Sequence, residues 1–166
     1  MSTLSPTFDR GMRSLTASVD LESPAEDVFS LLCSIEKWPV WLSFLRSARR
    51  VEYGEPIGLG SEVVLRSEVP GEEEQLYEVD QYITNHHLSL VGAYSVRRRV
   101  DFRVERKTSR SRLHVRLSYP AYHGRLAAVV EWWRRGRRRL GQLQGALTNF
   151  KGLVEYRRNE AALADL

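Results

Sequence analysis

The C-terminal part of the chain carries one unbroken apolar stripe, which constrains the fold more than any other feature. Its members recur at alternating spacings of three and four residues: Leu126, Val129, Trp133, Gly136, Leu140, Leu143, Leu147, Phe150 and Val154. That periodicity predicts one amphipathic helix of about eight turns. The positions beside the stripe are mostly arginine, so the charge complementarity of a coiled coil is missing. We therefore expect a long helix laid along a sheet.

The residues before this stripe alternate between apolar and polar, which is typical of strands with one buried face. The clearest case is 96–106, where Val100, Phe102 and Val104 fall on one side. Residues 112–119 alternate in the same way, and a turn at 108–110 makes the pair an antiparallel hairpin. Further strands are expected at 14–21, 49–53, 61–69, 75–84 and 88–93.

Two short helices are expected after the first strand. Pro24 suits the first position of a helix, with Ser23 as its cap and Glu26 completing a capping box. Pro39 is expected to end this helix, and a second helix is expected over 40–46. The sequence thus predicts one α+β domain over 13–158, with tails at 1–12 and 159–166.

Composition excludes several classes of protein. Hydrophobic residues make up 42% of the chain and charged residues 28%, which is too apolar for a disordered protein. No apolar stretch approaches the roughly 20 residues of a bilayer-spanning helix, and the first residues lack a signal-peptide core. Cys33 is the only cysteine, which excludes an internal disulfide and fits a reducing compartment. We expect a cytoplasmic protein.

Positive charge is concentrated in one segment. Residues 97–139 hold 15 basic and 3 acidic residues, whereas residues 1–96 hold 7 basic and 15 acidic. The densest part is a basic surface expected on the long helix: Arg134, Arg135, Arg137, Arg138 and Arg139. Two interpretations stay open, a solvated face partly neutralised by acidic groups or a surface that docks on anionic lipid. The chain lacks the aromatic platforms or reading helix of a nucleic-acid module, which argues against nucleic acid as a partner.

Several local signatures accompany this order of elements. They are the run 19–29 (VDLESPAEDVF), the segment 38–41 (WPVW), Gly58 and Gly60 before a strand, Pro70 and Gly71 in the next turn, and the ending 150–155. In these features the chain resembles the SRPBCC or START-like helix-grip superfamily. That superfamily includes START lipid-transfer domains, plant pathogenesis-related allergens and bacterial polyketide cyclases. The resemblance covers roughly residues 13–158.

The resemblance implies a helix-grip fold, in which a curved antiparallel sheet of six to seven strands wraps on the long helix. It also implies a cavity between sheet and helix for a small, mostly apolar ligand such as a lipid or polyketide. Three functions stay open: a carrier or sensor that docks on anionic membrane, a polyketide cyclase or dehydrase, and, as the least supported, a basic-surface binder of anionic membrane or nucleic acid. The absence of a clear acid–base pair favours the carrier. We expect no cofactor, and a monomer or homodimer.

Arg98 is the most unusual residue on the expected inward face, because it lies between Val96 and Val100. A buried guanidinium needs a carboxylate, carbonyl oxygens or an oxygen-bearing ligand. Either Arg98 points inward and anchors a carboxylate or enolate, or the strand starts after it and it stays at the exposed rim. Tyr77 and Tyr119 are the candidates for moving a proton on such a ligand.

Trp38 and Trp41 are expected either to pack in the core or to form an aromatic lid, and packing is the favoured interpretation. The candidate ligand-binding residues combine the inward strand positions with the helix stripe: Trp38, Trp41, Leu65, Tyr77, Gln81, Arg98, Val100, Phe102, Leu117, Tyr119, Trp133 and Leu140. The four histidines form no metal-ligand pattern, because His86 and His87 are adjacent in an expected turn and no acidic cluster accompanies them. No metal site is expected.

Overall fold

The computed structural model describes the backbone of residues 12–67, 74–120 and 127–164. Within these ranges the side chains of 12–13, 95–97, 119–120, 127–139, 161–162 and 164 are not described.

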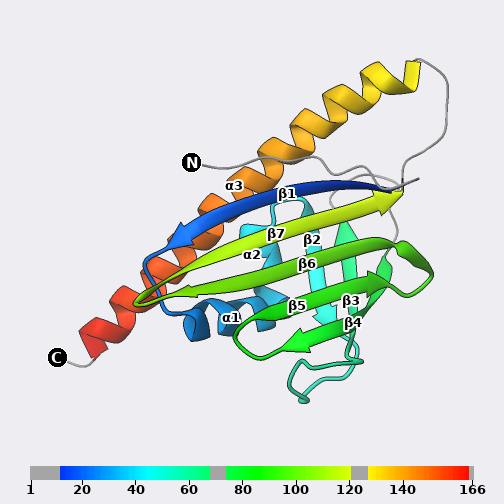
Figure 1. Cartoon of the computed structure of the whole chain (residues 1–166). Coiled ribbons are helices and arrows are strands. Elements are labelled where there is room, and N and C mark those ends of the chain that lie inside the picture. The colour runs from blue at the N-terminus through cyan, green and yellow to red at the C-terminus, as the bar shows by residue number, and fades with distance from the viewer. Residues whose placement is uncertain (1–11, 68–73, 121–126, 165–166) are drawn as a thin grey trace.

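The described chain forms seven strands and a small set of helices, in an order that matches the expected one (Figure 1). The elements are β1 (Met12–Leu21), α1 (Ala25–Cys33), the single-turn helix η1 (Ile35–Lys37), α2 (Trp38–Trp41), β2 (Leu45–Arg50), β3 (Glu62–Ser67), β4 (Gln75–Ile83), β5 (His87–Gly92), β6 (Ser95–Lys107), β7 (Arg110–Pro120) and α3 (Ala127–Ala164).

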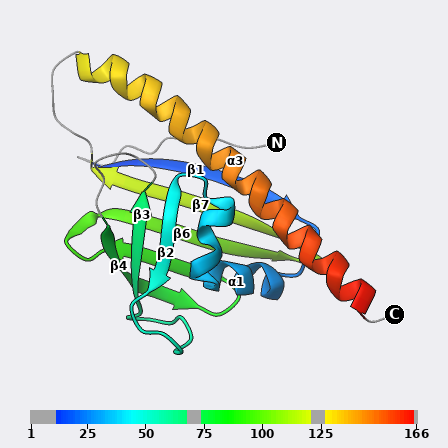
Figure 2. The same cartoon turned by 180° about the vertical axis from the view of Figure 1, so that it is seen from behind.

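All seven strands belong to one antiparallel sheet in the order β1-β7-β6-β5-β4-β3-β2. The sheet is a chain of hairpins, except that β1 returns to pair with β7 along its whole length, from Met12 opposite Pro120 to Leu21 opposite Ser111. The long helix α3 crosses one face of the sheet, with α1 and α2 on the same side (Figure 2). This arrangement confirms the expected α+β helix-grip fold.

The region between β1 and β2 differs from the expectation in two ways. Ser23 does not cap α1: its hydroxyl is buried without a hydrogen-bond partner among the described residues, while its carbonyl accepts a 2.8 Å bond from the Ser111 hydroxyl. Pro39 does not stop a helix but lies in the first turn of α2, where its missing N–H costs no hydrogen bond. The second helix therefore covers Trp38–Trp41, and β2 begins at Leu45.

The core lies between the inward face of the sheet and the helices. On α3 the stripe is confirmed where side chains are described, because Leu143, Leu147, Phe150 and Val154 are all buried. Leu140, one turn earlier, is only half-buried. A Cβ at Gly141 or Gly145 would meet nothing within 4 Å, so these two glycines do not mark a close approach. The stripe positions before Leu140 lie outside the described side chains.

Among the described residues, none of the helices is both long and apolar enough to span a bilayer.

Candidate functional site

The inward face of the sheet is covered at one end and partly exposed at the other. Phe102 on β6 and its β7 partner Val115 are each at most 1% exposed. Val100, two residues before Phe102 on β6, and its β7 partner Leu117 are only partly buried. Leu15, which pairs with Leu117 from β1, is also partly buried. The helices thus cover the end near Phe102 and leave apolar side chains accessible towards Val100. We call the region around Val100 and Leu117 the open end.

Arg98 lies at the open end, on the half of β6 where its ladder is irregular. Pairing of β6 with β5 shifts between Val91 and Gly92, whose partners are Arg99 and Ser95. The Arg98 side chain is half-buried, and its Nη1 donates a 2.6 Å hydrogen bond to Oε1 of Gln75 on β4. Gln75 faces inward, because it alternates with Tyr77 and Val79, which are both buried.

Gln75 also binds Tyr77. The Tyr77 hydroxyl donates to the same Oε1 atom at 3.3 Å, so two donors from two strands meet at one neutral oxygen. We refer to Gln75, Tyr77 and Arg98 as the Arg98 cluster. The sequence analysis missed Gln75, although its position two residues before Tyr77 puts both on one face of a strand. Chemically, the cluster offers N–H donors and one positive charge beside apolar side chains.

Among the described arginines that are partly buried, Arg98 differs in its partner. Arg99, its neighbour on the opposite face, pairs with the Asp80 carboxylate at 2.5 Å, and Arg50 pairs with Glu36 at 2.9 Å. Among the described residues, no carboxylate pairs with Arg98, which is held by an amide that carries no charge. Its positive charge is therefore left without a counter-charge in the described structure.

The two tryptophans belong to the covered end of the inward face and pack in the core, as the favoured interpretation has it. Both are 0% exposed, and both make edge-on contacts with Phe102 at ring-centroid distances of 5.3 and 6.1 Å. Trp41 also contacts Phe150 of α3 at 4.8 Å, which joins helix and sheet. The Trp38 indole donates a 2.8 Å bond to the Leu32 carbonyl, whereas the Trp41 indole nitrogen has no partner among the described residues.

Gln81 does not face inward as expected. The register of β4 against β5 shifts between Val79 and Gln81, which is a β-bulge that reverses the side-chain alternation. Gln81 is therefore exposed, while Tyr82 turns inward and its ring contacts Phe29 at 5.5 Å. Beyond a bulge, the alternation of apolar and polar residues no longer shows which side chains face inward.

The other candidates divide into described and undescribed positions. Leu65 and Phe102 are buried in the core cluster, and Leu140 is half-buried. Several candidates lie outside the described side chains: Tyr119, Trp133, Arg134, Arg135, Arg137, Arg138 and Arg139.

The outward face carries a second polar group that sequence reasoning missed. His87 begins β5 rather than lying in a turn; it is buried, and its Nε2 lies 3.2 Å from Oδ1 of Asp101. Nearby, Arg99 donates to the buried Ser89 hydroxyl at 3.0 Å and to Asp80. These contacts join β4, β5 and β6 on the face opposite the Arg98 cluster.

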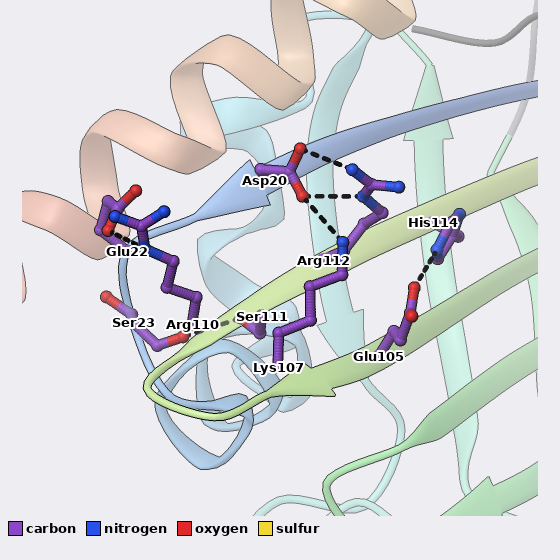
Figure 3. A network of polar contacts seen from close by, with 9 residues as sticks. All are labelled: Asp20, Glu22, Ser23, Glu105, Lys107, Arg110, Ser111, Arg112 and His114. Atoms are coloured by element: carbon purple, nitrogen blue, oxygen red, sulfur yellow. Dashed lines mark hydrogen bonds and ion pairs between the residues drawn. The ribbon is translucent and has the colours of Figure 1, made fainter. Parts of the chain in front are cut away.

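The basic β6–β7 hairpin is partly neutralised by the acidic first half of the chain (Figure 3). Arg112 donates two hydrogen bonds, of 2.7 and 2.8 Å, to the Asp20 carboxylate, and Lys107 Nζ lies 3.6 Å from the same group. Hydrogen bonding from Arg112 is the main reason that the pKa of Asp20 falls to about 2. Arg110 pairs with Glu22 at 2.7 Å, and Arg106 with Glu26.

No group of three or more His, Cys, Asp and Glu side chains that could hold a metal ion occurs in the described part of the chain. Cys33 is partly buried near the Tyr82 hydroxyl, and burial raises the pKa of its thiol. A raised pKa keeps a thiol protonated and poorly nucleophilic, so this environment does not activate Cys33 as a nucleophile.

Comparison with protein families gives one match over most of the chain. Residues 12–155 match the family described as polyketide cyclase / dehydrase and lipid transport. No curated protein sequence matches the chain.

Solved structures share the fold at low sequence identity. The Zhui aromatase/cyclase from a Streptomyces species aligns with a TM-score of 0.67 at 15% identity, over 88% of this chain and 95% of its own. A START superfamily protein from Mycobacterium smegmatis aligns with a TM-score of 0.62 at 18% identity, over 86% and 97%. A protein from Thermus thermophilus aligns with a TM-score of 0.70 at 13% identity, over 87% and 98%.

Proposed function

Because this chain belongs to the polyketide cyclase / dehydrase and lipid transport family, we propose that it binds a small, mostly apolar molecule between the sheet and α3. The observation that carries the proposal is the open end of the inward face. There Val100, Leu117 and Leu15 remain partly exposed beside the Arg98 cluster, although the same strands are fully covered a few residues further on. Small-molecule sites combine apolar walls with a few fixed polar groups, and this region supplies both.

A carrier or sensor is the function that these residues support best. The Arg98 cluster supplies hydrogen-bond donors and charge, but its acceptor is an amide, which is neither acid nor base near neutral pH. Catalysis of ring closure and dehydration needs a group that takes up and returns a proton. In the cluster only Tyr77 can serve, and its hydroxyl proton is engaged by Gln75.

The experiment that tests this function is native mass spectrometry of freshly purified protein, followed by organic extraction and identification of what is released. We expect an apolar compound of defined mass bound at one copy per chain. A protein that stays free of ligand and also fails to bind fatty acids, fatty alcohols or aromatic polyketides would overturn the proposal.

An enzyme resembling polyketide cyclases is the second candidate, supported by the family description and by Arg98, whose charge suits a carbonyl or enolate oxygen. Turnover of a linear poly-keto substrate that is lost in Arg98→Gln, with folding unchanged, would favour it over the carrier. Substrate that binds and leaves unchanged would exclude it.

The arginine-rich segment 134–139 suggests where a carrier would meet anionic membrane. Binding to vesicles that requires anionic lipid and falls as salt is added would support this docking. Equal binding to neutral vesicles, or none, would contradict it, and binding to generic RNA or DNA with a steep salt dependence would point to nucleic acid instead.

A further inference from the structure

Gln75 holds the guanidinium of Arg98 in place without cancelling its charge, and this is the feature of the site with the most specific chemical consequence. The 2.6 Å bond from Arg98 fixes one edge of the guanidinium, and the Tyr77 hydroxyl occupies the same amide oxygen. An amide oxygen accepts two hydrogen bonds, so this acceptor is filled. The remaining N–H donors of Arg98 have no partner among the described residues and are available to a ligand.

We propose that the Arg98 cluster is the receptor for the carboxylate of an otherwise apolar ligand, with Gln75 as the positioning residue; this inference rests on the proposed function. A guanidinium presents parallel N–H donors that match the two oxygens of a carboxylate, and such paired, charge-assisted bonds are among the strongest hydrogen bonds in proteins. The half-buried position of Arg98 reduces the screening of its charge by water.

The surroundings specify the rest of the ligand. Val100 follows Arg98 on the same side of β6, and Leu117 is its partner on β7. Both are partly exposed, so a hydrocarbon chain or ring that extends from Arg98 towards Phe102 would cover apolar surface. The ligand class that fits is an amphipathic monocarboxylate, such as a fatty acid or a polycyclic aromatic acid.

A neutral residue at position 75 is essential to this inference. Glutamate there would form an ion pair with Arg98 and compete directly with a ligand carboxylate. Arg99 illustrates this situation, because the Asp80 carboxylate already forms an ion pair with its guanidinium. Gln75→Glu should therefore retain the fold and lose carboxylate binding.

The test compares two probes of equal chain length, laurate and dodecanol, by isothermal titration at about pH 8, where a carboxylic acid is ionised. Wild-type protein is expected to bind laurate at least tenfold more tightly than dodecanol, the range of a charge-assisted hydrogen bond. Gln75→Glu should remove that preference by weakening laurate binding, whereas dodecanol, which has no carboxylate, should still bind. Gln81→Glu makes the same chemical change at an exposed position of the same strand and should keep the preference.

Arg98→Gln provides an independent variant, because it removes the positive charge at this position and keeps a polar amide. It should bind laurate and dodecanol equally. If wild-type protein binds both probes equally, or if Gln75→Glu keeps its preference for laurate, the inference is wrong while the proposed function stands. If Gln75→Glu loses both probes together, Gln75 is structural and the inference is also wrong. If wild-type protein binds neither probe, the inference is wrong, and the proposed function is contradicted as well if the protein is purified free of ligand and binds no aromatic polyketide.

Discussion

Charged side chains have different partners on the two faces of the sheet, and adjacent residues of β6 show the contrast. On the outward face Arg99 is bonded to Asp80 and Ser89, and on the neighbouring strand β7 Arg112 donates hydrogen bonds to Asp20 of β1. On the inward face Arg98 rests on the uncharged amide of Gln75. Charges that are paired with charges within one chain hold strands together. A charge that is held by an amide keeps the capacity to bind something else, which is why we propose a binding role for Arg98 and a structural one for Arg99.

The largest expected effect is a difference in stability between a buried and an exposed substitution on β6. Phe102→Ala removes a ring that is 0% exposed and contacts both core tryptophans, so we expect a loss of about 3–5 kcal/mol in the free energy of unfolding. Arg103→Ala, one residue away on the exposed face, should change it by less than about 0.5 kcal/mol. Urea unfolding of the two variants measures both values, and similar losses would break the distinction between the faces.

The next effect separates the two tryptophans of the covered end. Trp38→Phe removes the hydrogen bond to the Leu32 carbonyl, whereas Trp41→Phe removes an indole N–H without a partner among the described residues. Both variants lose ring volume, so Trp38→Phe should be more destabilising by about 1 kcal/mol. Thermal unfolding can rank them. A larger loss for Trp41→Phe would mean that its N–H has a partner, such as an ordered water.

The adjacent arginines give the third test. Arg99→Gln leaves the Asp80 carboxylate without its cation, and Oδ1 of Asp80 is already buried without a hydrogen-bond partner among the described residues. We expect the Arg99→Gln variant to have a free energy of unfolding lower than that of the wild type by about 1–2 kcal/mol. Arg98→Gln should change stability by less than about 0.5 kcal/mol, because it leaves no charge unpaired and the Gln75 oxygen still accepts the Tyr77 hydroxyl. If Arg98→Gln is the more destabilising variant, Arg98 is a structural residue and the contrast fails.

The smallest effect concerns pH on the outward face. The pKa of Asp20 is lowered to about 2, first by hydrogen bonding from Arg112, so the folded state holds the carboxylate charged more strongly than the unfolded state does. Its contribution to stability is therefore fully present above about pH 4, near the unfolded pKa of an aspartate, and is lost as the pH falls towards 2. Both side chains are partly exposed, so the effect should be small. Asp20→Asn should be slightly less stable than wild type at pH 6 and indistinguishable from it near about pH 2.

The fold was predictable because its main elements follow simple periodicities. The 96–106 and 112–119 alternation became the β6–β7 hairpin, and the stripe of three and four spacings became α3. The site was less predictable. Arg98 stood out as a charge among apolar neighbours, but Gln75 did not, because a polar residue at the start of a strand is common and its partner is far along the chain. Gln81 was misplaced because one bulge reversed its face, and bulges leave little trace in the pattern of apolar residues.

The pairing of β1 with β7 has a consequence for how this chain acquires its structure. The first strand leaves the ribosome with a row of apolar side chains, but it pairs with β7, the strand made last. Just beyond the end of β1, the Ser111–Ser23 bond spans 88 positions. Until β7 is synthesised, β1 has an open edge with nothing to pair with. Closing so long a loop is slow compared with forming hairpins. We expect β2 to β7 to assemble first, so that the strand made first is the one incorporated last.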